Sequence, residues 1–243
     1  MNNEKYNNND LPKTQKEREI YCKDIFDYLS KLSNNVEDRK IFLIIWMATI
    51  IQFPHIKTEV AIAMISEAQG MGKNFFYKLM TKLLGEDNTI LVDNLDSVFS
   101  RFANARLNKL FIFCDEVEYR ESKEYESRLK NAITEASFNY EVKGISPSVQ
   151  KSYENYVGAS NKLGAFQVEG YDRRYDIRII KNDIYGSLEE KKKYFDNLGL
   201  IIMGNPKKNI LPNYTPVKNL FLNVFFEKVY SMYSFFKFHK KNL

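Results

Sequence analysis

Cysteine and histidine are scarce in this sequence. Its 243 residues include only two cysteines, Cys22 and Cys114, and two histidines. Two cysteines cannot build a disulfide framework, and together with the histidines they are too scattered along the chain to form a zinc site. The sequence therefore indicates a protein of a reducing compartment, and its length allows one α/β domain with a substantial apolar core.

Long apolar runs and a strong charge of one sign are also missing. The longest uncharged apolar stretch, residues 41–53, is shorter than the roughly 20 residues that cross a bilayer, and the polar N-terminus does not resemble a secretory signal. We therefore expect no membrane segment and a cytoplasmic location. The net charge of +5 is compatible with nucleic-acid binding but does not by itself indicate it. A hydrophobic fraction of 44% excludes disorder of the whole chain.

Apolar runs and helical periodicity alternate along the middle of the chain. Helical spacing predicts helices over residues 17–32, 37–53, 73–84 and 125–136. Short apolar runs predict strands over residues 60–65, 110–114, 156–159 and 176–180, and residues 140–151 are expected to form a hairpin. The rest of the chain, including the aromatic-rich residues 220–238, is expected to be helical, with the lysines at 191–193 on a solvated face. Strands that alternate with helices predict an α/β fold with a mainly parallel sheet.

A glycine-containing loop follows the strand expected over residues 60–65. It consists of Gln69, Gly70, Met71, Gly72, Lys73 and Asn74. Glycines let backbone N–H groups approach a phosphate, a lysine reaches the outer phosphates, and a helix N-terminus lies behind them. Two positions depart from the usual phosphate-loop pattern: Glu67 replaces its first glycine, and Asn74 replaces a metal-binding hydroxyl residue, although an amide oxygen is still a suitable ligand. The alternative is a fortuitous glycine turn that caps a helix.

Two carboxylates, Asp115 and Glu116, come directly after the strand expected over residues 110–114. Ligands bind at the carboxyl ends of strands in open α/β sheets. In a nucleotide hydrolase the aspartate of such a pair holds Mg²⁺ and the glutamate polarises the attacking water. A solvated acidic turn is the alternative, but the preceding phosphate loop makes a nucleotide site the better interpretation.

Polar residues also follow the next two expected strands. Asn161 comes after residues 156–159 and could orient water against the terminal phosphate, or it could be an ordinary turn residue. Arg173 and Arg174 precede residues 176–180. These arginines are either solvated charges or an arginine finger offered to the nucleotide of a neighbouring subunit.

In this order, the four motifs resemble those of superfamily 3 helicases, the AAA+-related replicative helicases of viruses and plasmids. The similarity is to the helicase domain of phage and viral primase-helicases, including those of the poxvirus type, and it extends to residues 46–54. It implies a P-loop NTPase fold of the AAA+-like kind, with residues 59–185 as the ATPase core. A flexible leader (1–16), an N-terminal helical part (17–58) and a C-terminal helical segment (186–243) would flank that core. It also implies a cytoplasmic or viral replication site.

The resemblance also assigns roles to individual residues. Lys73 would contact the β- and γ-phosphates of ATP, Asn74 and Asp115 would hold Mg²⁺, and Glu116 would act on the lytic water. Asn161 would be the sensor, and Arg174, or else Arg173, the finger acting in trans. Within the hairpin over residues 140–151, Lys143 and Gly144 at the tip and the nearby Lys151 would bind single-stranded DNA in the pore of a homo-hexamer, unless this is an ordinary solvated hairpin.

The leading interpretation is therefore an ATP-driven helicase domain that translocates on single-stranded DNA. One alternative is an ATP-dependent ring scaffold or loader that does not translocate, and another is a P-loop kinase acting on a small molecule. The sequence shows no primase active site. A primase partner is expected on another chain or segment.

Overall fold

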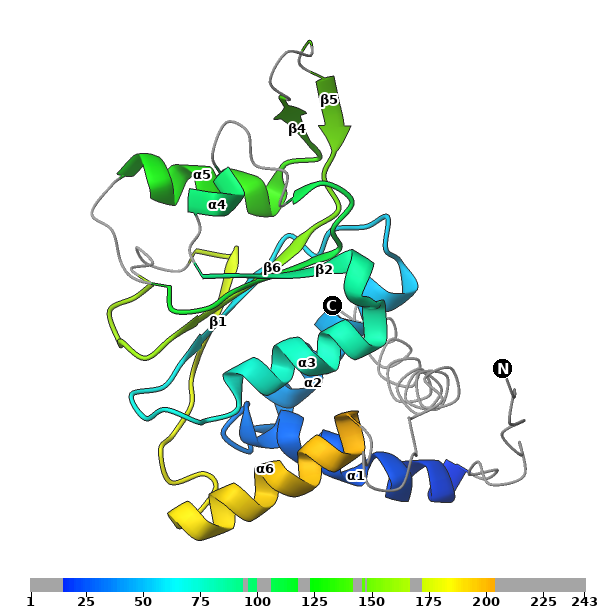
Figure 1. Ribbon diagram of the computed structural model, residues 1–243, viewed down its shortest axis with the longest axis vertical. Helices are drawn as coiled ribbons and strands as arrows, with labels where there is room; N and C mark the ends of the chain where they lie inside the picture. The colour runs from blue at the N-terminus through cyan, green and yellow to red at the C-terminus, as the bar shows by residue number, and fades with distance from the viewer. Residues whose placement is uncertain are drawn as a thin grey trace, which may run out of the picture.

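A computed structural model describes residues 15–93, 96–99, 106–117, 123–141, 146, 148–166 and 172–203 of the chain (Figure 1). Lys143, Gly144, the aromatic-rich residues 220–238 and most of the expected leader lie outside these ranges. Among the described helices, none is long and apolar enough to cross a membrane.

A five-stranded parallel sheet forms the centre of the fold. Its strands are β1 (Ala61–Ile65), β2 (Thr89–Val92), β3 (Phe111–Cys114), β6 (Asn155–Ser160) and β7 (Tyr175–Ile179). They lie in the order β2-β3-β6-β1-β7, and each neighbouring pair is parallel. The predicted α/β fold class with a mainly parallel sheet is confirmed. Of these five strands, β2 was not predicted; it is a four-residue edge strand that follows a short 3-10 turn.

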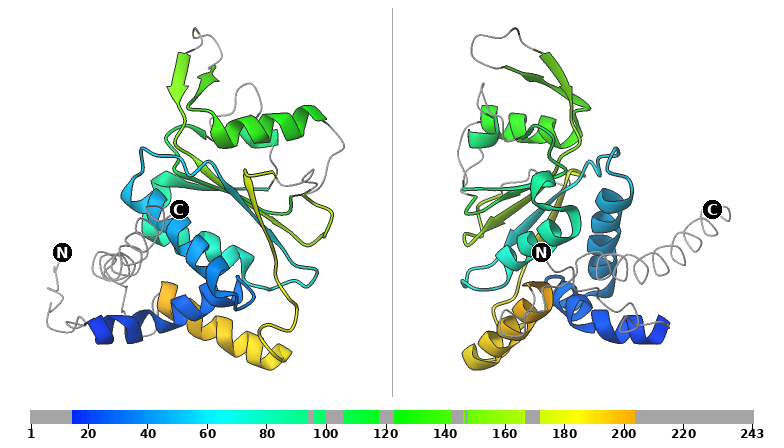
Figure 2. Two further views of the ribbon diagram at one scale, coloured as in Figure 1. Left: turned by 180° about the vertical axis from the view of Figure 1, so that it is seen from behind. Right: turned by 45° about the vertical axis from the view of Figure 1, so that its right-hand side comes forward.

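Helices cover both faces of this sheet (Figures 1 and 2). Every residue of β1, β3 and β6 is buried, as continuous apolar runs predict for strands that are covered on both sides. One face packs against α1 (Gln15–Lys31), α2 (Glu37–Gln52) and α3 (Lys73–Leu84). The other packs against α4 (Asp96–Phe99) and α5 (Lys123–Thr134). The site residues that end these strands are therefore held by a rigid core.

Buried residues of the two N-terminal helices belong to the same apolar core as the sheet. Trp46 of α2 is 3% exposed and its indole N–H donates a hydrogen bond of 2.7 Å to the carbonyl oxygen of Val60, just before β1. Arg178 of β7, which the sequence did not single out, is 1% exposed. Its guanidinium donates to Asp176 at 2.6 Å and to the Ser33 hydroxyl at 2.7 Å, at the corner between α1 and α2. These contacts fix the helices against the β1–β7 half of the sheet.

A two-stranded antiparallel sheet projects from the body of the molecule (Figures 1 and 2). It pairs β4 (Ser137–Tyr140) with β5 (Ser148–Lys151) in a register that places Ser137 opposite Lys151. A pair of antiparallel strands is therefore present where a hairpin was expected, but its first strand ends at Tyr140, the residue at which the expected hairpin over residues 140–151 begins. After β7 the chain continues into α6 (Leu188–Met203), the described part of the expected C-terminal helical segment.

Candidate active site

The glycine-containing loop connects the central strand β1 to α3, as the sequence predicted. Gly70 and Gly72 have φ angles of +69° and +88°, in the region that residues with a side chain rarely adopt. A Cβ atom at position 72 would also lie 2.8 Å from ring carbons of Phe195. Glycine is thus required at position 72 both by backbone conformation and by close packing. Glu67, the departure from the usual pattern, is exposed at the start of the loop.

Lys73, the first residue of α3, lies in a polar cluster at the end of β1. It is 8% exposed, and its ammonium group donates hydrogen bonds to Asn161 Oδ1 at 2.6 Å and to the Ser66 hydroxyl. Asn161 reaches it because β6, which precedes Asn161, is the parallel neighbour of β1. Burial lowers the pKa of Lys73 to about 8, although the charge of Asp115 opposes this shift.

The two carboxylates follow β3, on the other side of β6. Asp115 Oδ2 accepts a hydrogen bond of 2.7 Å from the amide nitrogen of Asn74, and its Oδ1 accepts one of 3.1 Å from the backbone N–H of Glu116. Glu116 has a φ of +53°, so the chain turns sharply at this residue. Because β3, β6 and β1 are parallel neighbours, their carboxyl ends lie at the same end of the sheet. As the sequence predicted, this brings five site residues together: Asp115, Glu116, Asn161, Lys73 and Asn74.

Asp115 and Asn74 fit a magnesium ion. Both carry hard oxygen atoms, and Mg²⁺ is usually held by one or two protein ligands, phosphate oxygens and water. Among the described residues, no group of three or more His, Cys, Asp or Glu side chains is placed to hold a metal by itself. Two protein ligands would leave the other coordination positions of such an ion to water or to further oxygen ligands.

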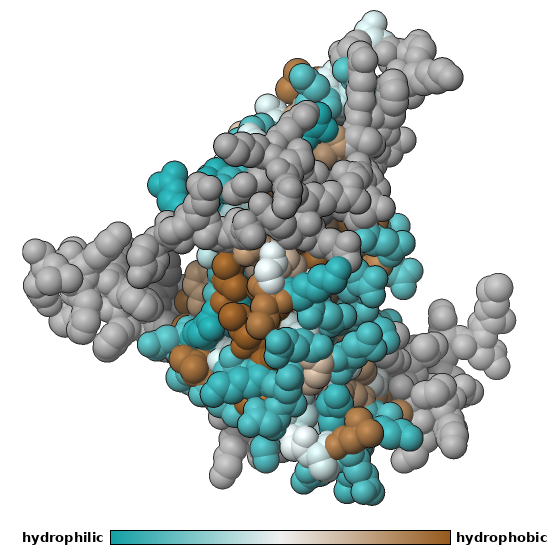
Figure 3. Space-filling model, turned by 90° about the vertical axis from the view of Figure 1, so that its left-hand side faces the viewer, coloured by the Kyte–Doolittle hydropathy of each residue, from teal (hydrophilic) through white to brown (hydrophobic). Residues whose placement is uncertain are grey.

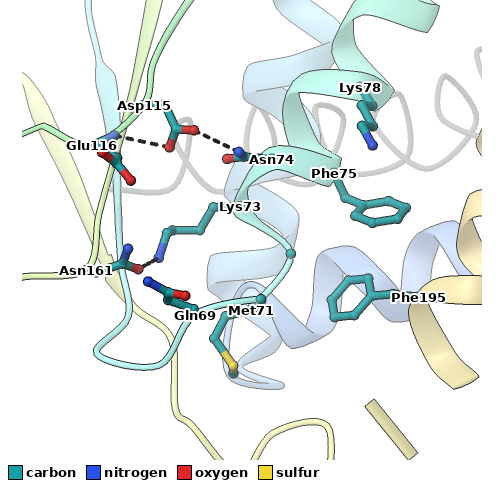
Figure 4. Close-up of a pocket in the computed structure, with 12 residues that line it drawn as sticks. Gln69, Met71, Lys73, Asn74, Phe75, Lys78, Asp115, Glu116, Asn161 and Phe195 are labelled. Atoms are coloured by element: carbon teal, nitrogen blue, oxygen red, sulfur yellow. Dashed lines mark hydrogen bonds between the residues drawn. The ribbon is translucent and has the colours of Figure 1, made fainter. Parts of the chain in front are cut away.

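A cavity of about 470 Å³ lies over the loop (Figure 4). Asp115, Glu116 and Asn161 line one side of the cavity, while Phe75, Lys78 and Phe195 lie on the other side of the loop. The rings of Phe75 and Phe195 are 5.0 Å apart. The cavity thus combines a polar end with an aromatic end.

Figure 3 shows the face of the molecule that lies on the left in Figure 1. On this face, apolar side chains gather in one compact group among hydrophilic ones.

The twin arginines are not among the residues that line this cavity. Arg174 donates two hydrogen bonds of 2.8 Å to the carboxylate of Asp172, and this pairing lowers the pKa of Asp172 to about 2. The side chain of Arg173 is exposed. Lys151, the described residue of the expected DNA-binding set, is exposed on β5. The structure therefore places neither the arginines nor Lys151 at the cavity of their own chain.

Contacts from distant parts of the chain hold the loop, and sequence reasoning missed them. The hydroxyl of Tyr28 in α1 donates a hydrogen bond of 2.7 Å to the Gly72 carbonyl oxygen. Lys191 of α6 donates one of 3.1 Å to the Gln69 carbonyl oxygen. Lys192 and Lys193 are exposed, as expected of a solvated face, whereas Lys191 is half-buried and also contacts the loop. No local pattern distinguishes the three lysines, because the difference arises from how α6 packs.

Comparisons with known proteins relate the chain to part of a phage protein. A family model described as a family of unknown function (DUF5906) matches residues 64–174, the segment that runs from β1 to Arg174. Over 182 residues the chain is 26% identical to the DNA primase-polymerase of Nitratiruptor phage NrS-1. This alignment covers 71% of the chain and 24% of the phage protein, so the chain spans about a quarter of that relative.

Solved structures of the NrS-1 C-terminal region share the fold. The apo structure of the NrS-1 C-terminal region matches with a TM-score of 0.62 and 22% identity, covering 81% of this chain and 48% of that one. A second apo structure of that region, the A form, matches with a TM-score of 0.57 and 21% identity, over 81% and 47% of the two chains. The strand order and the loop at the end of β1 give the described chain an α/β fold of the P-loop NTPase type.

Proposed function

We propose that the chain is an ATP-dependent DNA helicase domain of the superfamily 3 type, which hydrolyses ATP at the subunit interfaces of a ring and translocates on single-stranded DNA. One observation carries the nucleotide part of this proposal. Three adjacent strands, β1, β6 and β3, lead to one cavity. It is lined by the phosphate loop with Lys73, by the Asn74–Asp115 pair, and by Glu116 and Asn161. The similarity to a phage DNA primase-polymerase supports the DNA part.

The chemistry follows from the positions of these groups. Backbone N–H groups of the loop and the Lys73 ammonium would bind the phosphates, and Asn74 and Asp115 would hold Mg²⁺, which neutralises charge on the phosphates. Glu116 would accept a proton from the attacking water. Asn161 already receives a hydrogen bond from Lys73 and would orient both that lysine and the water. Arg174, or Arg173, would stabilise charge on the phosphates from the neighbouring subunit.

The DNA contact is assigned to the projecting β4–β5 hairpin. In a homo-hexamer each subunit would offer Lys143, Gly144 and Lys151 to the strand in the pore. We also propose that residues 59–185 are the ATPase core between the helical parts 17–58 and 186–243. Since the chain spans about a quarter of its phage relative, we propose that a primase acts on another chain or segment, at a viral replication site.

An ATPase assay with and without single-stranded DNA tests this function. We expect hydrolysis that single-stranded DNA stimulates, together with rings in negative-stain images. Hydrolysis in rings without stimulation would instead favour a scaffold or loader. Hydrolysis by a monomer would favour a small-molecule kinase, and absence of nucleotide binding would contradict the assignment of the loop.

Replacing Lys143 with alanine is expected to weaken DNA binding and to reduce its salt dependence. Each lost phosphate contact should flatten the slope of log K against log salt by about 0.7 for a single strand. The effect should not depend on base sequence, because phosphate contacts carry no sequence information. The slope is measured by fluorescence anisotropy with a labelled oligonucleotide, and Lys192→Ala, an exposed lysine on α6, is the control. An unchanged slope would indicate that Lys143 makes no contact with DNA phosphates and would contradict the proposed role of the hairpin.

The affinity for ATP is expected to depend on pH through Lys73. Burial lowers the pKa of Lys73 to about 8 in the nucleotide-free protein. As the pH rises above 8, this lysine loses its proton and its attraction for phosphate. The affinity should therefore fall by up to about tenfold for each pH unit above 8. Titrations with a fluorescent ATP analogue at pH 7, 8 and 9 measure the effect.

Lys73→Arg provides the control for this pH dependence, because a guanidinium keeps its charge throughout this range. At pH 7, Lys73→Arg should bind the ATP analogue more weakly than the wild type does. Its affinity should not change between pH 7 and pH 9. A wild-type affinity that does not change between pH 7 and pH 9 would contradict the assigned role of the ammonium group.

A further inference from the structure

The loop that we propose to bind phosphates is held from outside the sheet by the segment between β7 and α6. The backbone N–H of Ala68 donates to Asn182 Oδ1 at 3.2 Å, and the Tyr185 hydroxyl donates to the Met71 carbonyl oxygen at 3.4 Å. Phe195 packs so tightly on Gly72 that no side chain would fit there. Residues 182–195 therefore contact the loop along most of its length, and the position of α6 is coupled to that of the loop.

The first turn of α6 is also fixed by hydrogen bonds between its own residues. The Ser187 N–H donates to the Glu190 carboxylate at 2.7 Å, and the Glu190 N–H donates back to the Ser187 hydroxyl at 3.3 Å. This reciprocal pair is a capping box. Lys191, the next residue, starts from a fixed backbone position and reaches the loop with a long, flexible side chain.

The Lys191 ammonium group is hydrogen-bonded to a neutral acceptor. Its Nζ lies 3.1 Å from the Gln69 carbonyl oxygen and 3.8 Å from the point where a Cβ atom of Gly70 would be. Within the described part of the chain, no carboxylate forms an ion pair with Lys191. The positive charge of Lys191 therefore lies beside Gln69 and Gly70, which line the cavity, although Lys191 itself is not among the lining residues.

We propose that Lys191 is a second lysine of the same chain that binds the phosphates of the nucleotide, so that α6 is part of the nucleotide site. This inference rests on the proposed nucleotide-binding function. A phosphate oxygen is a stronger acceptor for an ammonium group than a peptide carbonyl is, because the hydrogen bond is then assisted by charge on both partners. A small movement of the Lys191 side chain from Gln69 to a phosphate would also tie α6 to the occupied loop.

Lysines adjacent to Lys191 provide matched controls. Lys191→Met keeps an unbranched side chain of similar length and good helix propensity but removes the charge. Lys192→Met and Lys193→Met make the same change at exposed positions on the same helix turn. Lys191→Arg restores a positive charge that can bind phosphate.

The affinity for a fluorescent ATP analogue with Mg²⁺ is the readout. We expect Lys191→Met to weaken binding about tenfold or more, the range for a hydrogen bond to a charged group, while Lys192→Met and Lys193→Met change it less than about twofold. Lys191→Arg should recover most of the loss. The melting temperature of nucleotide-free Lys191→Met should fall only slightly, because the variant loses one exposed hydrogen bond to Gln69. A role in docking α6 alone would instead predict a large fall in melting temperature.

Two results would overturn the proposal in different ways. Equal affinities for Lys191→Met and Lys192→Met, with a wild type that binds the analogue, would remove Lys191 from the site and leave the proposed function standing. A melting temperature that falls in parallel with affinity in Lys191→Met, without recovery in Lys191→Arg, would show a structural role instead. A wild type that binds no analogue would overturn both the proposed function and this inference.

Discussion

ATP hydrolysis is expected to fall by about 10²- to 10⁴-fold when Glu116 is replaced by glutamine, while nucleotide binding is retained. This is the usual contribution of a positioned proton acceptor, and a neutral amide cannot take the proton of the attacking water. The substitution preserves size and leaves the Asn74–Asp115 hydrogen bond in place. Phosphate release in single turnovers measures hydrolysis, and a fluorescent ATP analogue measures binding.

Glu59→Gln is the matched control for this substitution. Glu59 is also a glutamate with a left-handed backbone conformation, with φ of +55° against +53° for Glu116, but it precedes β1 and lies at the opposite end of that strand from the phosphate loop. Its replacement should leave hydrolysis unchanged. Lys73→Ala should differ from both, because it removes the ammonium group and so weakens binding itself. Hydrolysis at the wild-type rate in Glu116→Gln would contradict the assignment of the proton acceptor.

Local sequence patterns were sufficient to predict the loop and the strands around it. The predicted helix over residues 73–84 has the same bounds as α3, and the strands that deliver Asp115 and Asn161 lie where short apolar runs placed them. These segments are predictable because strands buried on both faces need continuous apolar runs. The edge strand β2 has only four residues, and its short run resembles many that do not form strands.

The packing around the loop could not be predicted in the same way. Tyr28, Lys191 and Phe195 contact the loop from helices that are far from it in the sequence. Nothing in the run of three lysines distinguishes the one that reaches Gln69 from the two that are exposed. The difference depends on the rotation of α6, which is fixed by packing of aromatic side chains such as Tyr185 and Phe195, 4.9 Å apart. Contacts of this kind follow from tertiary structure and leave no local signal.

The position of Arg174 bears on the role of the twin arginines. Its guanidinium is held by two hydrogen bonds to Asp172, and Lys130 lies 3.7 Å from the same carboxylate. An arginine held in this way is pre-oriented, as the proposed finger acting on a neighbouring subunit would need to be. Arg173 is exposed and carries the same charge one residue earlier. The two arginines therefore form a natural pair of test and control.

Replacing Arg174 with alanine is expected to reduce ATP hydrolysis by about 10³-fold or more, the effect of removing an arginine finger. Arg173→Ala should have a much smaller effect if Arg174 is the finger, and the reverse result would assign the role to Arg173. Because the arginine would act on the nucleotide of the next subunit, Arg174→Ala and Lys73→Ala subunits should each be inactive alone. Mixed rings would contain some interfaces that combine an intact Lys73 site with an intact Arg174.

Those mixed rings are therefore expected to recover part of the activity, and the recovered fraction should vary with the mixing ratio. Steady-state phosphate release across a series of ratios measures it, with ring formation checked by negative-stain imaging in each mixture. A finger that acted within its own chain would give no recovery at any ratio, because each subunit would then lack one essential group. Recovery would establish that the catalytic site is shared between subunits, which a monomeric small-molecule kinase would not show.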